Sequence, residues 1–203
     1  MKIIDIYNEA QKISKQILKE GKDPSRSSKR TDSMNKKLID YLKTIFTDPA
    51  YTFETEKGIK CSRGQKFKID VVMYKNGKIF SLFLLKGIQS SYNKNRYNYA
   101  NTTIGETSRI YDHKKIPKNL HSIWIDWIPN KVPVYDKYKN LIKTEECQIC
   151  DLSISQSRWN NTLQKERSSV FYSKIKFDYD FAKSKHDNVV GEDNLKKHLE
   201  GLK

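Results

Sequence analysis

The chain has 203 residues, with 39 Lys and Arg against 24 Asp and Glu, which gives a formal net charge of +15 at pH 7. This length fits one domain, and an apolar content of 36% is enough for a core. So large a positive charge on so short a chain favours a polyanionic partner, such as a nucleic acid. A composition inherited from an AT-rich genome would also raise the Lys and Asn content without any such partner.

Several classes of protein are disfavoured by what the sequence lacks. No run approaches the roughly 20 apolar residues of a membrane span, and the N-terminal segment does not have the pattern of a secretory signal. Three cysteines argue against a disulfide framework, and Cys147-x-x-Cys150 has no second ligand pair for structural zinc. A G-x-x-x-x-G-K-[ST] loop is absent, so no nucleotide cofactor is expected. We therefore expect a cytoplasmic protein that is not bound to a membrane.

The first part of the chain, residues 1–50, is predicted to be helical. Apolar residues at three- and four-residue spacings indicate helices over 3–18 and 34–46. Between them, the polar and basic segment 23–30 is interpreted as a connector, with an arm that contacts phosphates as the alternative. The cluster of Thr, Asp and Ser at 31–33 offers an N-cap to the second helix.

Residues 51–128 are predicted to form the core sheet, because the apolar period changes to alternation at Tyr51. The segment Lys66–Gly87 has the pattern of two strands joined by a tight Asn76-Gly77 turn. Its second half is apolar on both faces, as in a central strand covered on two sides. A further strand is expected over 120–127.

The remaining segments give weaker signals. Residues 88–103 are interpreted as a polar, aromatic loop and 103–112 as a short helix. Residues 171–181 alternate like an edge strand or a hairpin arm, and 192–203 suggest a short helix. The role of 145–203 stays open. Taken together, the elements predict one α/β domain over 1–203, with a central mixed β-sheet flanked by helices.

The two strands of the predicted hairpin carry an acid and a lysine that could contribute to one site. Asp70 follows Ile69 on the first strand, and Lys86 ends the second strand in the step Leu84-Leu85-Lys86. This order resembles the PD-(D/E)XK nuclease superfamily, to which many type II restriction endonucleases belong. The resemblance covers about 50–110.

That resemblance implies a restriction-endonuclease-like fold and a sequence-specific, Mg²⁺-dependent endonuclease that hydrolyses double-stranded DNA. Asp70 would be a metal ligand, and Lys86 would stabilise charge or position the attacking water. Because cutting both strands is most simply done by two copies of one site, a homodimer is expected.

Leu84 stands where the family has its second acid. One explanation is that this acid has migrated, with Glu106 as the best candidate for a catalytic and metal-binding carboxylate. Glu54 or Glu56 could also contribute. A second explanation is an inactivated nuclease, natural or engineered, that still binds DNA. The third is that the match is accidental.

Geometry sets a condition on the site, since Asp70 and Lys86 must emerge on one face of the sheet. A regular hairpin with a two-residue turn pairs Lys75 with Lys78 and directs Lys86 to the other face. A three-residue loop, or a β-bulge elsewhere in the hairpin, brings the two side chains to the same face. The nuclease interpretation therefore predicts one of these irregularities.

The segment after Lys86 is dense in side chains that suit DNA. Arg, Asn and Gln can read base edges, whereas Lys, Ser and Tyr suit phosphates. The candidate DNA-binding residues are Gln89, Ser91, Tyr92, Asn93, Lys94, Asn95, Arg96, Tyr97, Asn98 and Arg109. An Asn-rich surface loop is the plain alternative. The rival functions are DNA binding without catalysis, and RNA binding or cleavage, in which Tyr and Asn would contact unpaired bases.

Overall fold

The computed structural model describes residues 1–22, 28–60, 66–111, 120–138, 140–147, 170–180 and 185–203. Among these residues, a six-stranded sheet with the order β1-β2-β3-β4-β7-β8 forms the centre of the molecule. Its strands are β1 (Tyr51–Lys60), β2 (Lys66–Lys75), β3 (Lys78–Gly87), β4 (His121–Pro129), β7 (Val170–Asp180) and β8 (Lys185–Val190). The first three form an antiparallel meander, β3, β4 and β7 are parallel, and β8 returns antiparallel. The predicted mixed α/β sheet is therefore confirmed.

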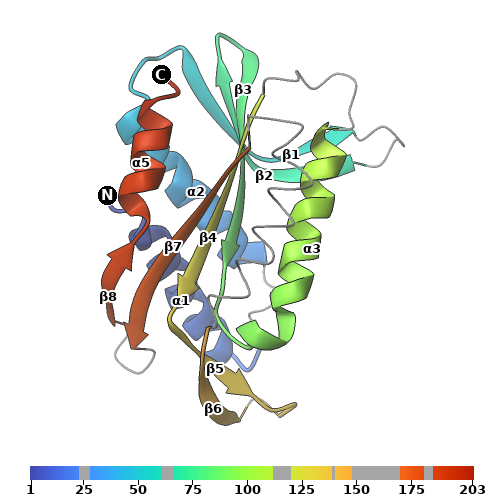
Figure 1. Cartoon of the computed structure of the whole chain (residues 1–203), viewed down its shortest axis with the longest axis vertical. Coiled ribbons are helices and arrows are strands. Elements are labelled where there is room, and N and C mark those ends of the chain that lie inside the picture. Colours follow the sequence, from blue (N-terminus) through green and yellow to red (C-terminus); the bar gives the residue numbers. More distant parts are fainter. Residues whose placement is uncertain (23–27, 61–65, 112–119, 139, 148–169, 181–184) are drawn as a thin grey trace.

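Helices cover both faces of this sheet (Figure 1). On one face lie α1 (Ile4–Lys19), α2 (Ser28–Ile45) and α5 (Glu192–Glu200), and on the other lies α3 (Tyr92–Tyr111). A separate two-stranded sheet of β5 (Lys131–Tyr135) and β6 (Leu141–Glu146) extends beyond the end of the main sheet. Among the described residues, none of the helices combines the length and apolarity that crossing a bilayer requires.

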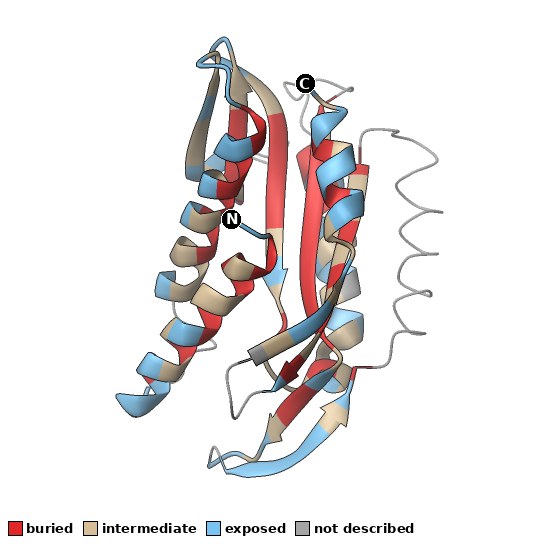
Figure 2. Ribbon diagram, turned by 90° about the vertical axis from the view of Figure 1, so that its left-hand side faces the viewer, coloured by how far each residue is buried: buried red, intermediate tan, exposed pale blue. Residues whose placement is uncertain are grey.

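Two of the apolar clusters formed by the described residues join the helices to the main sheet. The larger one joins α1, α2 and α5 to side chains such as Val71, Phe83 and Trp127, and the smaller one joins α3 to Leu82, Leu84 and Trp124. Figure 2 shows the buried residues concentrated along the central strands, while β6 is mostly exposed. Alternate residues of β3 and β4 thus serve opposite faces of the sheet, as the pleat requires.

Two predictions about the elements are wrong, and a third is confirmed in one of its two alternatives. The second helix begins at Ser28, so residues 31–33 lie inside it rather than at its cap. The strand at 171–181 is not an edge strand, because β7 lies between β4 and β8, although it does form a hairpin with β8. Residues 92–103 of the predicted loop belong to α3, which also contains most of the short helix expected over 103–112.

Apolar periodicity does not predict the start of α3, because the inner face of this helix is built from aromatic and hydroxyl side chains. Tyr92, Thr107 and Ile110 are buried, and Thr103 donates a hydrogen bond to the carbonyl of Tyr99 within the helix. The hydrophobic signal that marks most amphipathic helices comes from aliphatic residues. In α3 these are concentrated in its last two turns.

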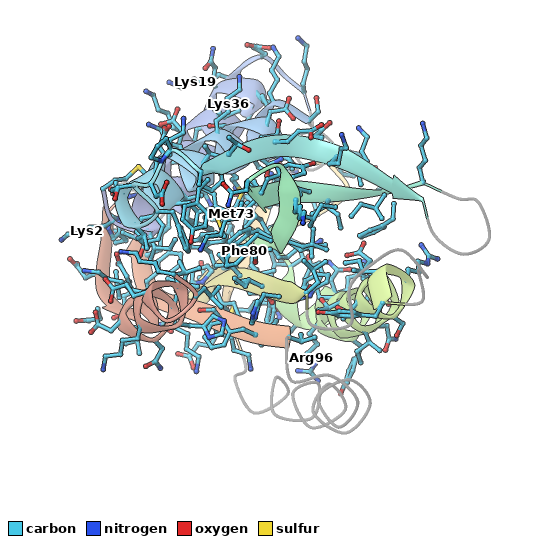
Figure 3. The ribbon with its side chains drawn as sticks, turned by 90° about the horizontal axis from the view of Figure 1, so that it is seen from above. Lys2, Lys19, Lys36, Met73, Phe80 and Arg96 are labelled. Atoms are coloured by element: carbon cyan, nitrogen blue, oxygen red, sulfur yellow. The ribbon has the colours of Figure 1, made fainter. Side chains whose placement is uncertain are left out.

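A bulge in the β2–β3 hairpin decides which side chains share a face. Asn76 and Gly77 both have positive φ and form a two-residue turn that pairs Lys75 with Lys78. Tyr74 then pairs with Ile79, but Met73 pairs with Ser81, so Phe80 is an extra residue. Figure 3 shows Met73 and Phe80 near each other in the middle of the molecule. The predicted irregularity is thus confirmed in the form of a bulge.

Candidate functional site

A cavity of about 180 Å³ opens between β2, β3 and α3. The bulge shifts the register by one residue, so that Val71 pairs with Phe83, and Asp70, which precedes Val71 on β2, lies beside Leu84. Asp70, Leu84 and Lys86 therefore face α3 together. The residues around the cavity are Phe67, Lys68, Asp70, Leu84, Leu85, Lys86, Tyr99, Thr102, Thr103, Glu106 and Trp124.

Asp70 is fixed at the wall of this cavity by the neighbouring strand. Its Oδ2 accepts a hydrogen bond of 2.8 Å from the backbone N–H of Leu85. Burial raises the pKa of the Asp70 carboxyl to about 6, against the opposing effects of this hydrogen bond and the nearby Lys86. A carboxylate that is costly to ionise where it stands gains most from a cation beside it.

Glu106 reaches the cavity from α3. The lining residues Tyr99, Thr102, Thr103 and Glu106 are spaced by three or four positions, which places them on one face of the helix. Burial raises the pKa of the Glu106 carboxyl, and the nearby Asp70 adds to this effect while Lys86 opposes it. The structure thus brings the two acids and the lysine predicted from the sequence to one place.

Lys86 is exposed and is one of the residues that line the cavity. Its Nζ lies 4.8 Å from the centre of the Tyr99 ring, within the range of a cation–π interaction. The aromatic ring of α3 therefore limits where the ammonium group can lie.

The other candidate acids are placed differently. Glu54 accepts hydrogen bonds from Lys57 and from the Tyr74 hydroxyl, and Glu56 forms an ion pair of 2.9 Å with Lys68. Neither acid lines the cavity. Leu84 does line it, at 3% exposure, and packs in the apolar cluster beneath α3.

The donor set of the cavity can be compared with the needs of metal ions. Within the described part of the chain, no three His, Cys, Asp or Glu residues are grouped as metal ligands. Asp70 and Glu106 supply carboxylate oxygens only, and one or two carboxylates completed by water and phosphate are the usual environment of protein-bound Mg²⁺. Zinc, which prefers Cys and His, finds no such donors among the lining residues.

The predicted DNA-binding residues divide between internal and outward-facing roles. Gln89 accepts hydrogen bonds from Ser14 and Arg30, while Asn93 binds Glu145 and the backbone of Glu146. The backbone carbonyl of Ser91 accepts a hydrogen bond from Asn95, Tyr92 is buried, and Arg96 lies over the ring of Tyr97. Of the predicted DNA-binding residues, four are exposed on α3, namely Lys94, Tyr97, Asn98 and Arg109.

One buried acid near the site was not expected from the sequence. Asp126 on β4 is 6% exposed, pairs in register with Lys86, and accepts a hydrogen bond from the hydroxyl of Tyr172. The available signal was a single acid within the otherwise apolar strand IWIDW. A charged residue in a strand that is buried on both faces calls for a partner or a function.

Comparisons with known proteins do not assign a function to the site, so its interpretation depends on its geometry. A scan against protein-family models matches no family, and a search of curated proteins finds no match. Among solved structures, one match is described as NucC of P. aeruginosa ATCC27853 in its cAAA-bound form. The two chains are 14% identical with a TM-score of 0.46, and the alignment covers 98% of this chain and 88% of that chain.

Proposed function

We propose that the protein is a Mg²⁺-dependent endonuclease that hydrolyses phosphodiester bonds of double-stranded DNA. The observation that carries this proposal is the meeting of Asp70, Glu106 and Lys86 in one cavity. Three separate elements supply these side chains, and the hairpin needs a bulge to align two of them. The pairing of two carboxylates with a lysine suits the hydrolysis of a phosphodiester.

In this proposal Glu106 replaces the acid that is missing at Leu84. Asp70 and Glu106 would hold Mg²⁺, and the N–H of Leu85 keeps the Asp70 carboxylate turned toward the cavity. When bound there, the ion would lower the pKa of a water ligand and offset charge on the phosphate. Lys86 would contact the scissile phosphate or hold the attacking water, since its ammonium group is exposed beside both acids.

Duplex DNA as the substrate is supported by charge and by α3. The chain carries +15, and the outer face of the helix next to the cavity presents Lys94, Asn98 and Arg109. Lys and Arg suit phosphates, whereas Asn and Arg can also read base edges, which is the basis for proposing sequence specificity. A homodimer would place two such sites on the two strands, and sedimentation of the protein with and without a DNA duplex tests this part.

The test is cleavage of supercoiled plasmid in Mg²⁺ by the wild type and by Asp70→Asn, Glu106→Gln and Lys86→Met. Each substitution is expected to lower the cleavage rate by ~100-fold or more, because the two carboxylates would hold the metal ion and the lysine would act on the phosphate or the attacking water. Chelation of the metal should abolish cleavage. Asp40→Asn, the same chemical change on the exposed surface of α2, serves as the matched control and should keep the wild-type rate.

Leu84 favours a second candidate function, DNA binding without catalysis, because a buried leucine occupies the cavity wall at the place of the missing acid. Duplex binding without cleavage by the wild type, together with cleavage by Leu84→Glu, would identify an inactivated nuclease. Binding or cleavage of single-stranded RNA in preference to duplex DNA would instead support the RNA alternative.

A further inference from the structure

Next to the proposed site, three charged residues form a row across adjacent parallel strands. The register pairs Lys86 of β3 with Asp126 of β4, and Asp126 with Lys174 of β7. Neighbouring strands lie about 4.8 Å apart, and register partners in a sheet direct their side chains to the same face. The row therefore has alternating signs, with one carboxylate between two ammonium groups on the face covered by α3.

Asp126 is buried, which is unusual for a carboxylate that only balances charge on the surface. Its Oδ2 accepts the hydrogen bond from Tyr172, and its Oδ1 has no hydrogen-bond partner among the described residues. Burial raises the pKa of the Asp126 carboxyl to about 6, although Tyr172, Lys86 and Lys174 all act to lower it. An unpaired oxygen on a buried carboxylate is costly, and such groups persist mostly where function retains them.

The flanking lysines differ in their surroundings. Burial lowers the pKa of Lys174 to about 8, and its Nζ lies 5.3 Å from the ring centre of Tyr172. Lys86 is exposed and lies against Tyr99 on its other side. Lys86 is thus near both the Tyr99 ring of α3 and the negative charge of Asp126 on the neighbouring strand.

We propose that Asp126, held in place by Tyr172, is a positioning residue that keeps the Lys86 ammonium at the mouth of the cavity. The role assigned to Lys86 rests on the proposed nuclease function, whereas its restraint by Asp126 does not. The charge of Asp126 attracts the ammonium group of Lys86 on one side and that of Lys174 on the other. Without that charge, the flexible lysine chain would leave the position from which it can reach a phosphate in the cavity.

Steady-state cleavage of duplex DNA by Asp126→Asn tests this role, since the amide keeps the shape and the bond to Tyr172 but removes the charge. The turnover number is expected to fall ~10-fold or more while KM stays within about twofold of wild type. Tyr172→Phe keeps the charge but frees the carboxylate, so a smaller fall, about threefold, is expected. Wild-type turnover by a folded Asp126→Asn protein would overturn the proposal.

The double variant Asp126→Asn, Lys174→Met separates positioning from charge balance. If Asp126 serves only to offset Lys174, removing both charges restores turnover, and the proposal fails. If Asp126 positions Lys86, turnover stays low in the double variant.

A second readout does not depend on DNA. Carbon relaxation of the Lys86 side chain, with its signal assigned by Lys86→Arg, should report a more ordered Cε in the wild type than in Asp126→Asn. Equal order in the two proteins would overturn the proposal. A wild-type protein that cuts no DNA would remove the nuclease function alone, and this measurement would still decide whether Asp126 restrains Lys86.

Discussion

Two carboxyls on the face of the sheet beneath α3 have pKa values raised by burial. Asp70 and Asp126 both reach about 6, from an ordinary value of 3.8. In each case the buried environment outweighs the attraction of the nearby Lys86. The folded protein therefore holds these protons more tightly than the unfolded chain does, and ionising the two groups at neutral pH lowers the stability of the fold.

The effect of ionisation on stability can be measured for Asp126. Below about pH 4 its carboxyl is protonated in the folded protein and Asp126→Asn should unfold at nearly the wild-type temperature. As the pH rises through 6, the wild type loses the stability of the protonated form, whereas the amide cannot ionise. At pH 7.5 the variant should be more stable by on the order of 2 kcal/mol. Thermal unfolding of both proteins from pH 4 to pH 7.5 tests this, and equal midpoints throughout would contradict it.

At the scale of elements, the site depends on a bulged hairpin and one helix. The bulge at Phe80 sets Asp70, Leu84 and Lys86 on one face, and α3 brings Glu106 to that face. Neither element alone makes the cavity.

Two glycines in these elements allow opposite predictions for the same substitution. A Cβ at Gly105, inside α3, would meet no atom within 4 Å, so Gly105→Ala should stabilise the protein by ~0.5–1 kcal/mol and leave cleavage unchanged. Gly77 has a φ of +72°, so Gly77→Ala should destabilise the protein by about 1 kcal/mol. Thermal unfolding of the two variants against the wild type measures both. A gain at Gly77, or a loss at Gly105, would be inconsistent with the turn and helix described.

Strand alternation and a turn dipeptide are short-range signals, and they were enough to predict the hairpin. The need for an irregularity and the choice of Glu106 came from the nuclease resemblance, which requires Asp70 and Lys86 on one face and a second acid nearby. The start of α3 at Tyr92 was missed because aromatic and hydroxyl side chains form its inner face. Asp126 was missed for a different reason. Its pairing with Lys86 depends on a parallel register between strands far apart in the chain, which no local pattern encodes.

At the scale of the molecule, basic side chains lie on both helical layers. Figure 3 shows Lys19 and Lys36 on the opposite side of the sheet from Arg96 of α3. If the chain binds DNA as proposed, its net charge of +15 would act through the phosphates. Because the proposed site lies beside α3, we expect the layer of α3 to contact the DNA.

The salt dependence of DNA binding can test whether the layer of α3 contacts the DNA. Replacing both Lys94 and Arg109 with Gln should lower the slope of log K against log salt concentration by ~2, about one for each phosphate that is no longer neutralised. Replacing both Lys19 and Lys36 with Gln removes the same charge from the other layer and should leave the slope unchanged. Fluorescence anisotropy with a labelled duplex provides the measurement. The reverse result would assign the DNA to the layer of α1 and α2.

In the proposed mechanism, Asp70 on β2 and Glu106 on α3 act as one metal-binding unit. A double-mutant cycle on the rate of Mg²⁺-dependent plasmid cleavage, with Asp70→Asn, Glu106→Gln and both together, tests this claim most directly. When two groups act as a unit, removing either one lowers the rate as much as removing both. We predict that each single variant and the double variant fall to nearly the same rate, ~100-fold or more below wild type. Wild-type cleavage by Glu106→Gln, or losses that simply multiply in the double variant, would contradict the claim.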